Sequence, residues 1–406
     1  MEKLLLQAIE DLSHLHKFTD EEMGVLEKAD KAADALVEPE YEHYLKREVN
    51  KEAPKIARKY GLFKIPIKRE YGGFGVSPLV GVLAKERLSQ TGLGFGSFLS
   101  VHSYMCSAAV QNWGDDAQKE RYLEPAVEGK FIFAFGLTEP EAGSDPQSMK
   151  TTYKKEGNRF IINGSKYLIT NGGIAGCVIV FAKAKGSGEI TAFLVDSKSD
   201  GFNVAMHLSE KVGLFTSDTA MLEFDGVEVP KENVLGGVGN GLHIAYATLV
   251  NGRMGVASSC VGIIDGALNA VASRAKERIQ FGKPIGKHQL VQRHVAIIRQ
   301  NLEMARWPTY FAAIRKEAYE KDMKNKDLIR EMDMRSSLAK KIASGLAFDS
   351  ADHAMQVFGG FGYSLLSPVG QLFCDSRVAR IYEGTDEIQE LKIAASVLGD
   401  DFRAFE

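Results

Sequence analysis

One carboxylate near the C-terminus has surroundings that suit a general base. Glu383 follows an apolar and an aromatic residue and precedes a Gly-Thr turn, after which residues 387–397 have the spacing of an amphipathic helix. Apolar neighbours raise the pKa of a carboxyl group towards neutrality, which a base needs in order to remove a weakly acidic proton. The alternative is an ordinary helix start, in which Thr385 or Asp386 caps the helix and Glu383 is solvated.

Four further segments place polar groups beside turns, where a ligand can approach the backbone closely. They are Phe135–Asp145, Asn163–Gly172, Arg278–Ile285 with Gln289, and Gln356–Tyr363. Each also has an ordinary structural explanation when taken alone. These explanations are a capped loop, a packed strand edge, a surface salt bridge of the arginine and a glycine at a helix C-terminus.

Composition limits the classes of protein to consider. The chain has 406 residues, 45% hydrophobic and 25% charged, as in an ordinary globular protein with room for two or three domains. A net charge of −3 gives no reason to expect nucleic acid or a membrane as a partner, and no apolar run reaches the roughly 20 residues of a membrane span. The N-terminus resembles no targeting peptide, so we expect a cytoplasmic protein. Four widely spaced cysteines predict neither disulfides nor a metal site.

The elements that must position these residues form three blocks. Helical spacing dominates residues 1–130, short strand-like runs dominate 131–240, and helical spacing returns in 241–406. We therefore predict an α+β fold with an N-terminal helical domain, a middle antiparallel β-barrel or sandwich, and a C-terminal four-helix bundle. Within the middle block, Asn163-Gly164 and Asp225-Gly226 predict two-residue hairpin turns.

Taken together in this order, the segments resemble the acyl-CoA dehydrogenase family. The matching positions are Phe135–Asp145, Thr170-Asn171-Gly172, Arg253, Arg278 to Gln289, Gln356–Gly360 and Ile381–Glu387. The resemblance covers nearly the whole chain and agrees with its helix–strand–helix order. It implies FAD-dependent oxidation of an acyl-CoA thioester to the 2-enoyl-CoA, with electrons passed to electron-transferring flavoprotein.

The resemblance also assigns the chemistry. It implies that Glu383 removes the α-proton while the β-hydride goes to flavin N5. The backbone N–H of that glutamate and an FAD ribityl hydroxyl would hold the thioester oxygen. One branch of the family carries its base on a helix, directly before an arginine that matches Arg253. That position is Gly252 here, which leaves Glu383 as the candidate base.

Two groups of cofactor-binding residues follow from the resemblance. Those expected around the flavin are Phe135, Leu137, Thr138, Gly143, Ser144, Leu168, Ile169, Thr170, Thr385 and Glu387. Those expected to hold the pyrophosphate and adenine across a subunit boundary are Arg278, Phe281, Gln289, Gln356, Val357, Gly359 and Gly360. Ser144, Asn251, Arg253 and Gly384 are the expected contacts to the acyl-CoA. The family norm implies a homotetramer, built as a dimer of dimers.

Departures from the family pattern bear on the substrate. Leu168 replaces a tryptophan that covers part of the flavin, and Phe215 and Cys374 stand where arginines are common. Glutaryl-CoA members carry an arginine near the position of Gly96, which argues against a decarboxylating glutaryl-CoA enzyme. With Gly92 and Gly94, this glycine predicts room at the inner end of the acyl pocket. We therefore expect a bulky, branched or aryl-substituted acyl chain, such as benzylsuccinyl-CoA, with an ordinary short or branched chain as the alternative.

Two rival functions stay open from the sequence. One is an acyl-CoA oxidase-type flavoenzyme that uses O2, although such enzymes are usually much longer. The other is a catalytically silent relative that only binds acyl-CoA. A silent protein need not keep a carboxylate at position 383, so Glu383 argues against it.

Overall fold

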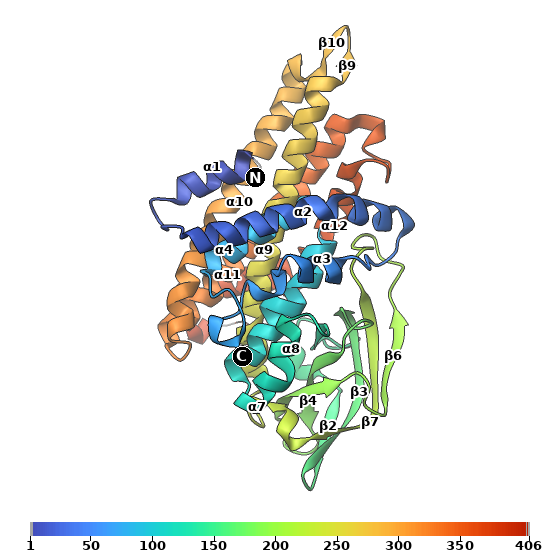
Figure 1. Ribbon diagram of the computed structural model, residues 1–406, viewed down its shortest axis with the longest axis vertical. Coiled ribbons are helices and arrows are strands. Elements are labelled where there is room, and N and C mark those ends of the chain that lie inside the picture. The colour runs from blue at the N-terminus through green and yellow to red at the C-terminus, as the bar shows by residue number, and fades with distance from the viewer. Residues whose placement is uncertain (1–2, 403, 405–406) are drawn as a thin grey trace.

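The computed structural model describes residues 3–402 and 404 (Figure 1). Helices from both ends of the chain form an elongated helical body, and one β-sheet lies at the end of the molecule opposite the β9–β10 hairpin (Figure 1). Apolar cores fill the helical body, the contact between helices and sheet, and the sheet itself. The predicted α+β fold, with helical, β and helical parts in that order, is confirmed.

The N-terminal helices include one deeply buried helix, α4. They are α1 (Lys3–Leu12), α2 (Asp20–Lys46), α3 (Ala53–Lys59), α4 (Pro78–Leu88), α5 (Gly94–Leu99), the π-helical η3 (Ser100–Ser107), α6 (Ala108–Trp113), α7 (Asp116–Gln118), the π-helical η4 (Lys119–Leu123) and α8 (Glu124–Val127). Ten residues of α4, from Leu79 to Leu88, are buried, including Lys85, Glu86 and Arg87. A helix that buries charges must supply partners for them, since an isolated buried charge is costly.

The middle sheet has eight strands in the order β6-β7-β3-β2-β4-β5-β8, with β1 added beside β4. The strands are β1 (Phe133–Gly136), β2 (Thr152–Glu156), β3 (Arg159–Thr170), β4 (Cys177–Ala184), β5 (Ile190–Asp196), β6 (Phe202–His207), β7 (Thr219–Pro230) and β8 (Val234–Leu235). Most neighbours pair antiparallel, as predicted, but β4 pairs parallel with β1 and β2. Strands β4 and β5 are buried along most of their length.

The two predicted hairpin turns are wrong. Asn163-Gly164 lies inside β3 and Asp225-Gly226 lies inside β7, and the two strands pair with each other along their length. The register shifts between Ile162 and Gly164, where the Asn163 side chain accepts a hydrogen bond from the Gly226 N–H at 2.9 Å. Glycine and asparagine are favoured in a β-bulge for the same conformational reason as in a turn.

The C-terminal helices form a bundle around α9. They are α9 (Gly241–Glu277), α10 (Gln289–Lys321), α11 (Lys326–Phe358), α12 (Pro368–Val378) and α13 (Asp386–Leu398), and the two-residue strands β9 (Ile279–Gln280) and β10 (Lys283–Pro284) form a hairpin between α9 and α10. Helix α9 is long and apolar enough to cross a membrane, but its apolar stretch is 83% buried inside the protein. Such burial is typical of a core helix, and the long helix spans the molecule from the sheet to the hairpin (Figure 1).

Candidate active site

Buried polar side chains hold the loop that carries Glu383. Lys340 Nζ donates a hydrogen bond to the Gly384 carbonyl at 2.8 Å and lies 3.5 Å from Asp386 Oδ1. Gln389 Nε2 donates to the same carbonyl at 2.9 Å. All three side chains are buried, so each contact is made away from competing water. The loop was predicted from the sequence, but the roles of Lys340 and Gln389 were not.

The backbone of this loop is wound into an uncommon conformation. Glu383 has φ 56° and Gly384 has φ 90°, so two successive residues are left-handed. A left-handed non-glycine residue costs on the order of 1 kcal/mol and persists when its surroundings fix it. A Cβ on Gly384 would lie 2.5 Å from Gln389 Nε2, so the position requires glycine. The strain is concentrated on the residue predicted to do the chemistry.

The carboxylate of Glu383 faces helix α9 at Gly252. A Cβ on Gly252 would lie 2.3 Å from Glu383 Oε2, so any side chain there would displace the carboxylate. The predicted base and the position of the alternative base therefore converge on one point. Glu383 is half-buried as a residue, but its Oε2 atom is shielded from solvent and has no hydrogen-bond partner among the described residues.

The electrostatics of the carboxylate suit a base that works near neutral pH. Burial raises the pKa of Glu383 to about 7, against the positive charges of Arg253, Lys85 and Lys340, which lower it. Desolvation therefore outweighs three cations, none of which forms an ion pair with this carboxylate within the described chain. Over the same residues, the backbone N–H of Glu383 donates no hydrogen bond, which leaves a donor free beside the carboxylate.

Arg253, one of the predicted acyl-CoA contacts, binds side chains of helix α11. Its guanidinium is 2% exposed, and Nη1 lies 2.7 Å from Asp333 Oδ1 and 3.0 Å from Ser336 Oγ of α11. Arg253 thus fixes α9 to α11, and its nucleotide contact stays a prediction. Asn251 instead lines a cavity on α9, and Ser144 is exposed on its loop.

A buried ion pair ties the first two predicted flavin segments together. Lys166 Nζ lies 2.6 Å from Glu139 Oε1 and donates to the Leu137 carbonyl at 3.1 Å, and both charged side chains are at most 2% exposed. The pair fixes the loop after β1 against β3. Thr138 binds the same strand, because its carbonyl accepts a hydrogen bond from the Tyr167 N–H at 2.9 Å.

The end of β3 presents an apolar side chain to solvent. Leu168 is 51% exposed and has φ 58°, at an irregularity in the pairing of β3 with β7. Ile169 beside it is buried, and Thr170 is half-buried. Phe135 is half-buried, Leu137 buried and Gly143 exposed. Contacts of these residues and Thr138 with a flavin stay a prediction.

Thr385 and Glu387 confirm part of the helix-start interpretation. The Thr385 hydroxyl accepts a hydrogen bond from the Ile388 N–H at 3.4 Å and caps α13. Glu387 is exposed in the first turn. Capping and the raised pKa of Glu383 therefore coexist in one loop. A cofactor contact by either residue stays a prediction.

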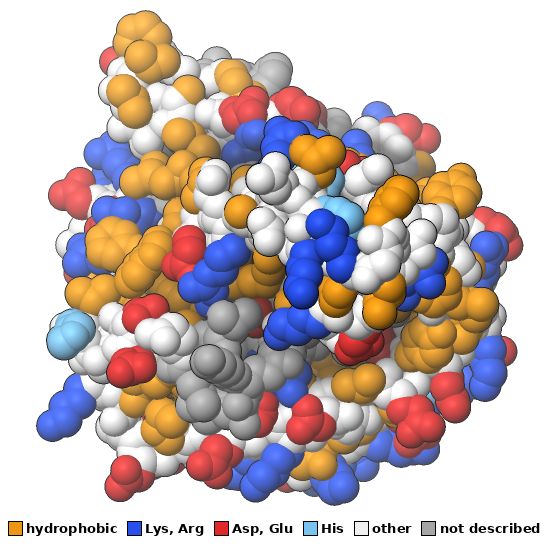
Figure 2. All heavy atoms as spheres, turned by 90° about the horizontal axis from the view of Figure 1, so that it is seen from above, with side chains coloured by type: hydrophobic (Ala, Val, Ile, Leu, Met, Phe, Trp, Pro, Cys, Tyr) orange, Lys and Arg blue, Asp and Glu red, His pale blue; other side chains and the backbone are white. Residues whose placement is uncertain are grey.

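The second predicted cofactor group lies at the opposite end of α9. Arg278 and Gln280 line a cleft of about 590 Å³ together with Val357, Gly359 and Gly360. The rise of a helix puts this cleft on the order of 40 Å from Gly252. Basic and exposed hydrophobic side chains lie next to one another on this end of the molecule (Figure 2). Phe281 is 93% exposed, and Gln289 and Gln356 are also exposed.

One arginine of this cleft was missed from the sequence. Arg274 lines the cleft, its guanidinium carbon lies 5.4 Å from the centre of the Phe358 ring and 5.7 Å from that of Phe361, and its buried Nε has no partner among the described residues. An unpaired guanidinium beside exposed glycines suits an anionic ligand. The position of Arg274 one helical turn before Arg278 was the available signal.

The prediction that three glycines leave room in an acyl pocket is wrong. A Cβ on Gly94 would lie 1.8 Å from Thr216 Oγ1, and a Cβ on Gly96 would lie 2.6 Å from Ser89 Oγ. A Cβ on Gly92 would lie 2.5 Å from the amide nitrogen of Gln371. The glycines allow neighbouring elements to approach closely, and the space beside them is filled.

Comparison with known families covers almost the whole chain. Residues 19–130, 134–227 and 239–398 match the N-terminal, middle and C-terminal domains of acyl-CoA dehydrogenase. The chain belongs to the acyl-CoA dehydrogenase family. An acyl-CoA dehydrogenase of Bacillus subtilis is 39% identical over 344 residues, which cover 84% of this chain and 88% of the relative. A subunit of the caffeyl-CoA reductase-Etf complex of Acetobacterium woodii is 35% identical over 84% of this chain and 88% of the relative.

Solved structures agree with this family assignment. Butyryl-CoA dehydrogenase of Megasphaera elsdenii superposes with a TM-score of 0.88 at 35% identity, and the match covers 95% of this chain and 100% of that one. An acyl-CoA dehydrogenase of Bacillus anthracis, solved with FAD, superposes with a TM-score of 0.87 at 29% identity, covering 94% of this chain and 67% of that one. The recognition of the family from the sequence is confirmed.

Proposed function

We propose that this acyl-CoA dehydrogenase family member removes the α-proton of an acyl-CoA thioester with Glu383 and forms the 2-enoyl-CoA with FAD as cofactor. The observation that carries the proposal is the environment of the Glu383 carboxylate. Burial raises its pKa to about 7, and its buried Oε2 atom has no hydrogen-bond partner in the described chain. The carboxylate faces Gly252, which has no side chain. A base matched to neutral pH needs this combination.

The residues present fit FAD in two places. The exposed Leu168 and the neighbouring Thr170 and Thr138 offer an apolar surface with hydroxyls at its edge, which suits a flavin ring. The cleft with Arg274 and Arg278 offers two guanidinium groups and bare glycine backbone, which suit a pyrophosphate. When bound, FAD would supply the acceptor for the β-hydride at flavin N5.

The chain's own residues would carry the proton transfer. With the substrate thioester beside the loop, the free backbone N–H of Glu383 is placed to donate a hydrogen bond to the thioester oxygen. That bond stabilises the negative charge that develops on the oxygen as the α-proton leaves. Glu383 Oε2 then receives the proton. Lys340 and Gln389 keep the carboxylate in place, because both hold the next carbonyl of the loop.

The two FAD-fitting surfaces lie far apart within one chain. Their separation supports a complete site that is shared between subunits, and we propose the homotetramer implied by the family, a dimer of dimers. Electron-transferring flavoprotein is the proposed acceptor, supported by the relative that is a subunit of a complex with it. We propose a cytoplasmic location. A bulky, branched or aryl-substituted acyl chain stays a proposal that rests on Leu168 alone, since the glycine argument has failed.

Anaerobic titration of the purified protein with a panel of acyl-CoA thioesters tests the proposal. The protein should be yellow, and a matching thioester should bleach the flavin while a 2-enoyl-CoA forms. A yellow protein that binds thioesters without bleaching would point to a silent acyl-CoA-binding relative. Rapid reoxidation of the bleached flavin by O2 would point to an oxidase. A protein that takes up no FAD would contradict both the dehydrogenase and the oxidase function.

A further inference from the structure

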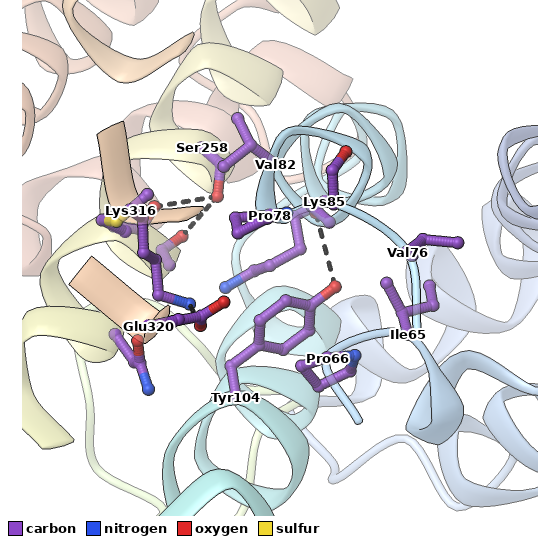
Figure 3. Close-up of a pocket in the computed structure, with 15 residues that line it drawn as sticks. Ile65, Pro66, Val76, Pro78, Val82, Lys85, Tyr104, Ser258, Lys316 and Glu320 are labelled. Atoms are coloured by element: carbon purple, nitrogen blue, oxygen red, sulfur yellow. Dashed lines mark hydrogen bonds and ion pairs between the residues drawn. The ribbon is translucent and has the colours of Figure 1, made fainter. Parts of the chain in front are cut away.

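A cavity next to the base contains a lysine that the proposed reaction does not use. The cavity, of about 50 Å³, lies between α4, η3, α9 and α10, and Lys85 and Tyr104 extend into it (Figure 3). Asn251, Met254 and Gly255 form its wall on α9. A cavity of this size accommodates a group of only a few atoms.

Lys85 differs from the other buried lysines of the described chain. Lys166 and Lys340 are also buried, but each has a carboxylate partner, Glu139 at 2.6 Å and Asp386 at 3.5 Å. Within the same described residues, no carboxylate pairs with Lys85, which is 1% exposed.

The remaining contacts of Lys85 are weak for an ammonium group. Its Nζ donates to Ser100 Oγ at 3.0 Å and lies 5.1 Å from the centre of the Tyr104 ring. One neutral hydroxyl and one ring do not replace the hydration of a cation. Burial lowers the pKa of Lys85 to about 7, although the charge of Glu383, which forms no ion pair with it, acts in the opposite direction. The neighbouring residues of α4 show the contrast. Glu86 pairs with Arg306, and Arg87 lies 2.7 Å from Asp30 Oδ1.

The lysine lies one helical turn from the catalytic carboxylate. A Cβ on Gly255 would lie 2.6 Å from Lys85 Nζ, just as a Cβ on Gly252 would lie 2.3 Å from Glu383 Oε2. Residues three apart on a helix have Cβ positions about 5–6 Å apart. A group that reaches Lys85 from the reacting carbon must therefore sit a few bonds further along the acyl chain.

We propose that Lys85, aided by Ser100, binds a carboxylate carried by the acyl chain a few bonds beyond the carbon that Glu383 deprotonates. The substrates would be CoA thioesters of dicarboxylic acids. This inference rests on the proposed function and names its substrate class. An acyl carboxylate would provide the anion that Lys85 lacks, and Tyr104 would form the wall beside it. A neutral alkyl chain would leave the ammonium buried and unpaired, which is costly.

The test compares two thioesters of equal length, adipyl-CoA and hexanoyl-CoA, with the FAD-loaded enzyme. The readout is the ratio of their kcat/KM values for anaerobic flavin reduction. The wild type should favour adipyl-CoA, and Lys85→Met should lower this ratio on the order of 100-fold, whereas Lys85→Arg should keep part of it. The matched control is Lys64→Met, at a lysine that pairs with Glu128 at 2.6 Å and lies outside the lining of the cavity.

Other outcomes overturn the inference. A wild type that prefers hexanoyl-CoA, or a ratio unchanged by Lys85→Met, would contradict it, and an equal loss on both thioesters would show that Lys85 acts only through Glu383. Calorimetric Kd values in a Glu383→Gln background give a readout that does not need turnover. If neither thioester reduces the flavin, the Kd ratio with and without Lys85→Met still decides the inference, and the panel of acyl-CoA thioesters decides the proposed function separately.

Discussion

The two ends of helix α9 show two kinds of site. Near Gly252, the chain itself closes the site: the carboxylate of Glu383 is desolvated, and its loop is held by buried Lys340 and Gln389. At the other end, Arg274 and Arg278 line an open cleft beside exposed Phe281. The first site is thus buried and its loop is held by hydrogen bonds, whereas the two arginines of the second site line an open cleft.

Because of this difference, we expect one end of α9 to determine the rate of proton transfer and the other end to determine the affinity for FAD. Proton abstraction needs a low-dielectric environment and fixed geometry, which one chain provides around Glu383. Holding a large anionic cofactor needs positive charge and accessible backbone, which the open cleft provides. Changes at the first end should therefore affect the rate with FAD still bound. Changes at the second end should affect the affinity for FAD.

The largest effect is expected from Glu383→Gln. The amide keeps the size of the side chain but cannot accept the α-proton, so turnover should fall on the order of 10⁴-fold. The yellow colour and thioester binding should persist. Steady-state rates with the electron acceptor, beside the FAD content of each preparation, measure the change. Turnover within tenfold of the wild type would assign the base elsewhere.

Gly252→Ala should give the next largest effect. The new Cβ would lie 2.3 Å from Glu383 Oε2, so the carboxylate must shift. A misplacement near 1 Å costs about 100-fold in rate. Gly345→Ala is the matched control, because that glycine of α11 has nothing within 4 Å of its Cβ position. Equal activity of both variants would place the working carboxylate away from α9.

Arg274→Ala should change the affinity for FAD and leave the rate per bound FAD unchanged. Loss of one guanidinium from the cleft should weaken FAD binding roughly 30-fold, the order expected for a charge-assisted hydrogen bond. Flavin reduction per bound FAD should stay near the wild-type rate. Titration of the apoprotein with FAD measures the affinity. Arg159→Ala, an exposed arginine of β3 paired with Glu228 at 2.9 Å, should leave it unchanged.

The pH dependence should be the smallest effect. Glu383 must be deprotonated to act, and burial raises its pKa to about 7, so kcat/KM should rise about tenfold per pH unit below pH 7 and level off above it. Initial rates at constant ionic strength from pH 5.5 to 8.5 give the profile. A midpoint near 4.5, the ordinary value for a glutamate, would mean that Glu383 is solvated in the working enzyme.

The family, the α+β fold and the loop that carries Glu383 could be predicted from the sequence alone. The sequence also points to Glu383 as the proposed base, because several segments agree in order and because Gly252 cannot be a base. Lys340 and Gln389 were not found, because they act through tertiary contacts that no local pattern encodes. Lys85 was missed for the same reason, since a lysine within a helix gives no sign that its partner is absent.

The structural roles of glycines were the features predicted least well from the sequence. Asn163-Gly164 and Asp225-Gly226 look like hairpin turns but form paired irregularities inside two long strands. Gly94 and Gly96 look like free space but are filled by Thr216, Ser89 and Ser259. In both cases the sequence shows that a side chain is excluded, and only the fold shows what excludes it.

The central claim is that Glu383 removes the α-proton, and hydrogen exchange on acetyl-CoA tests it most directly. Acetyl-CoA has α-protons but no β-hydrogen, so it can be deprotonated without being oxidised. The FAD-loaded wild type in D2O at pH 8 should introduce deuterium into the acetyl methyl group, as followed by NMR, and Glu383→Gln should not exceed the enzyme-free rate. Exchange by the variant as fast as by the wild type would contradict the account.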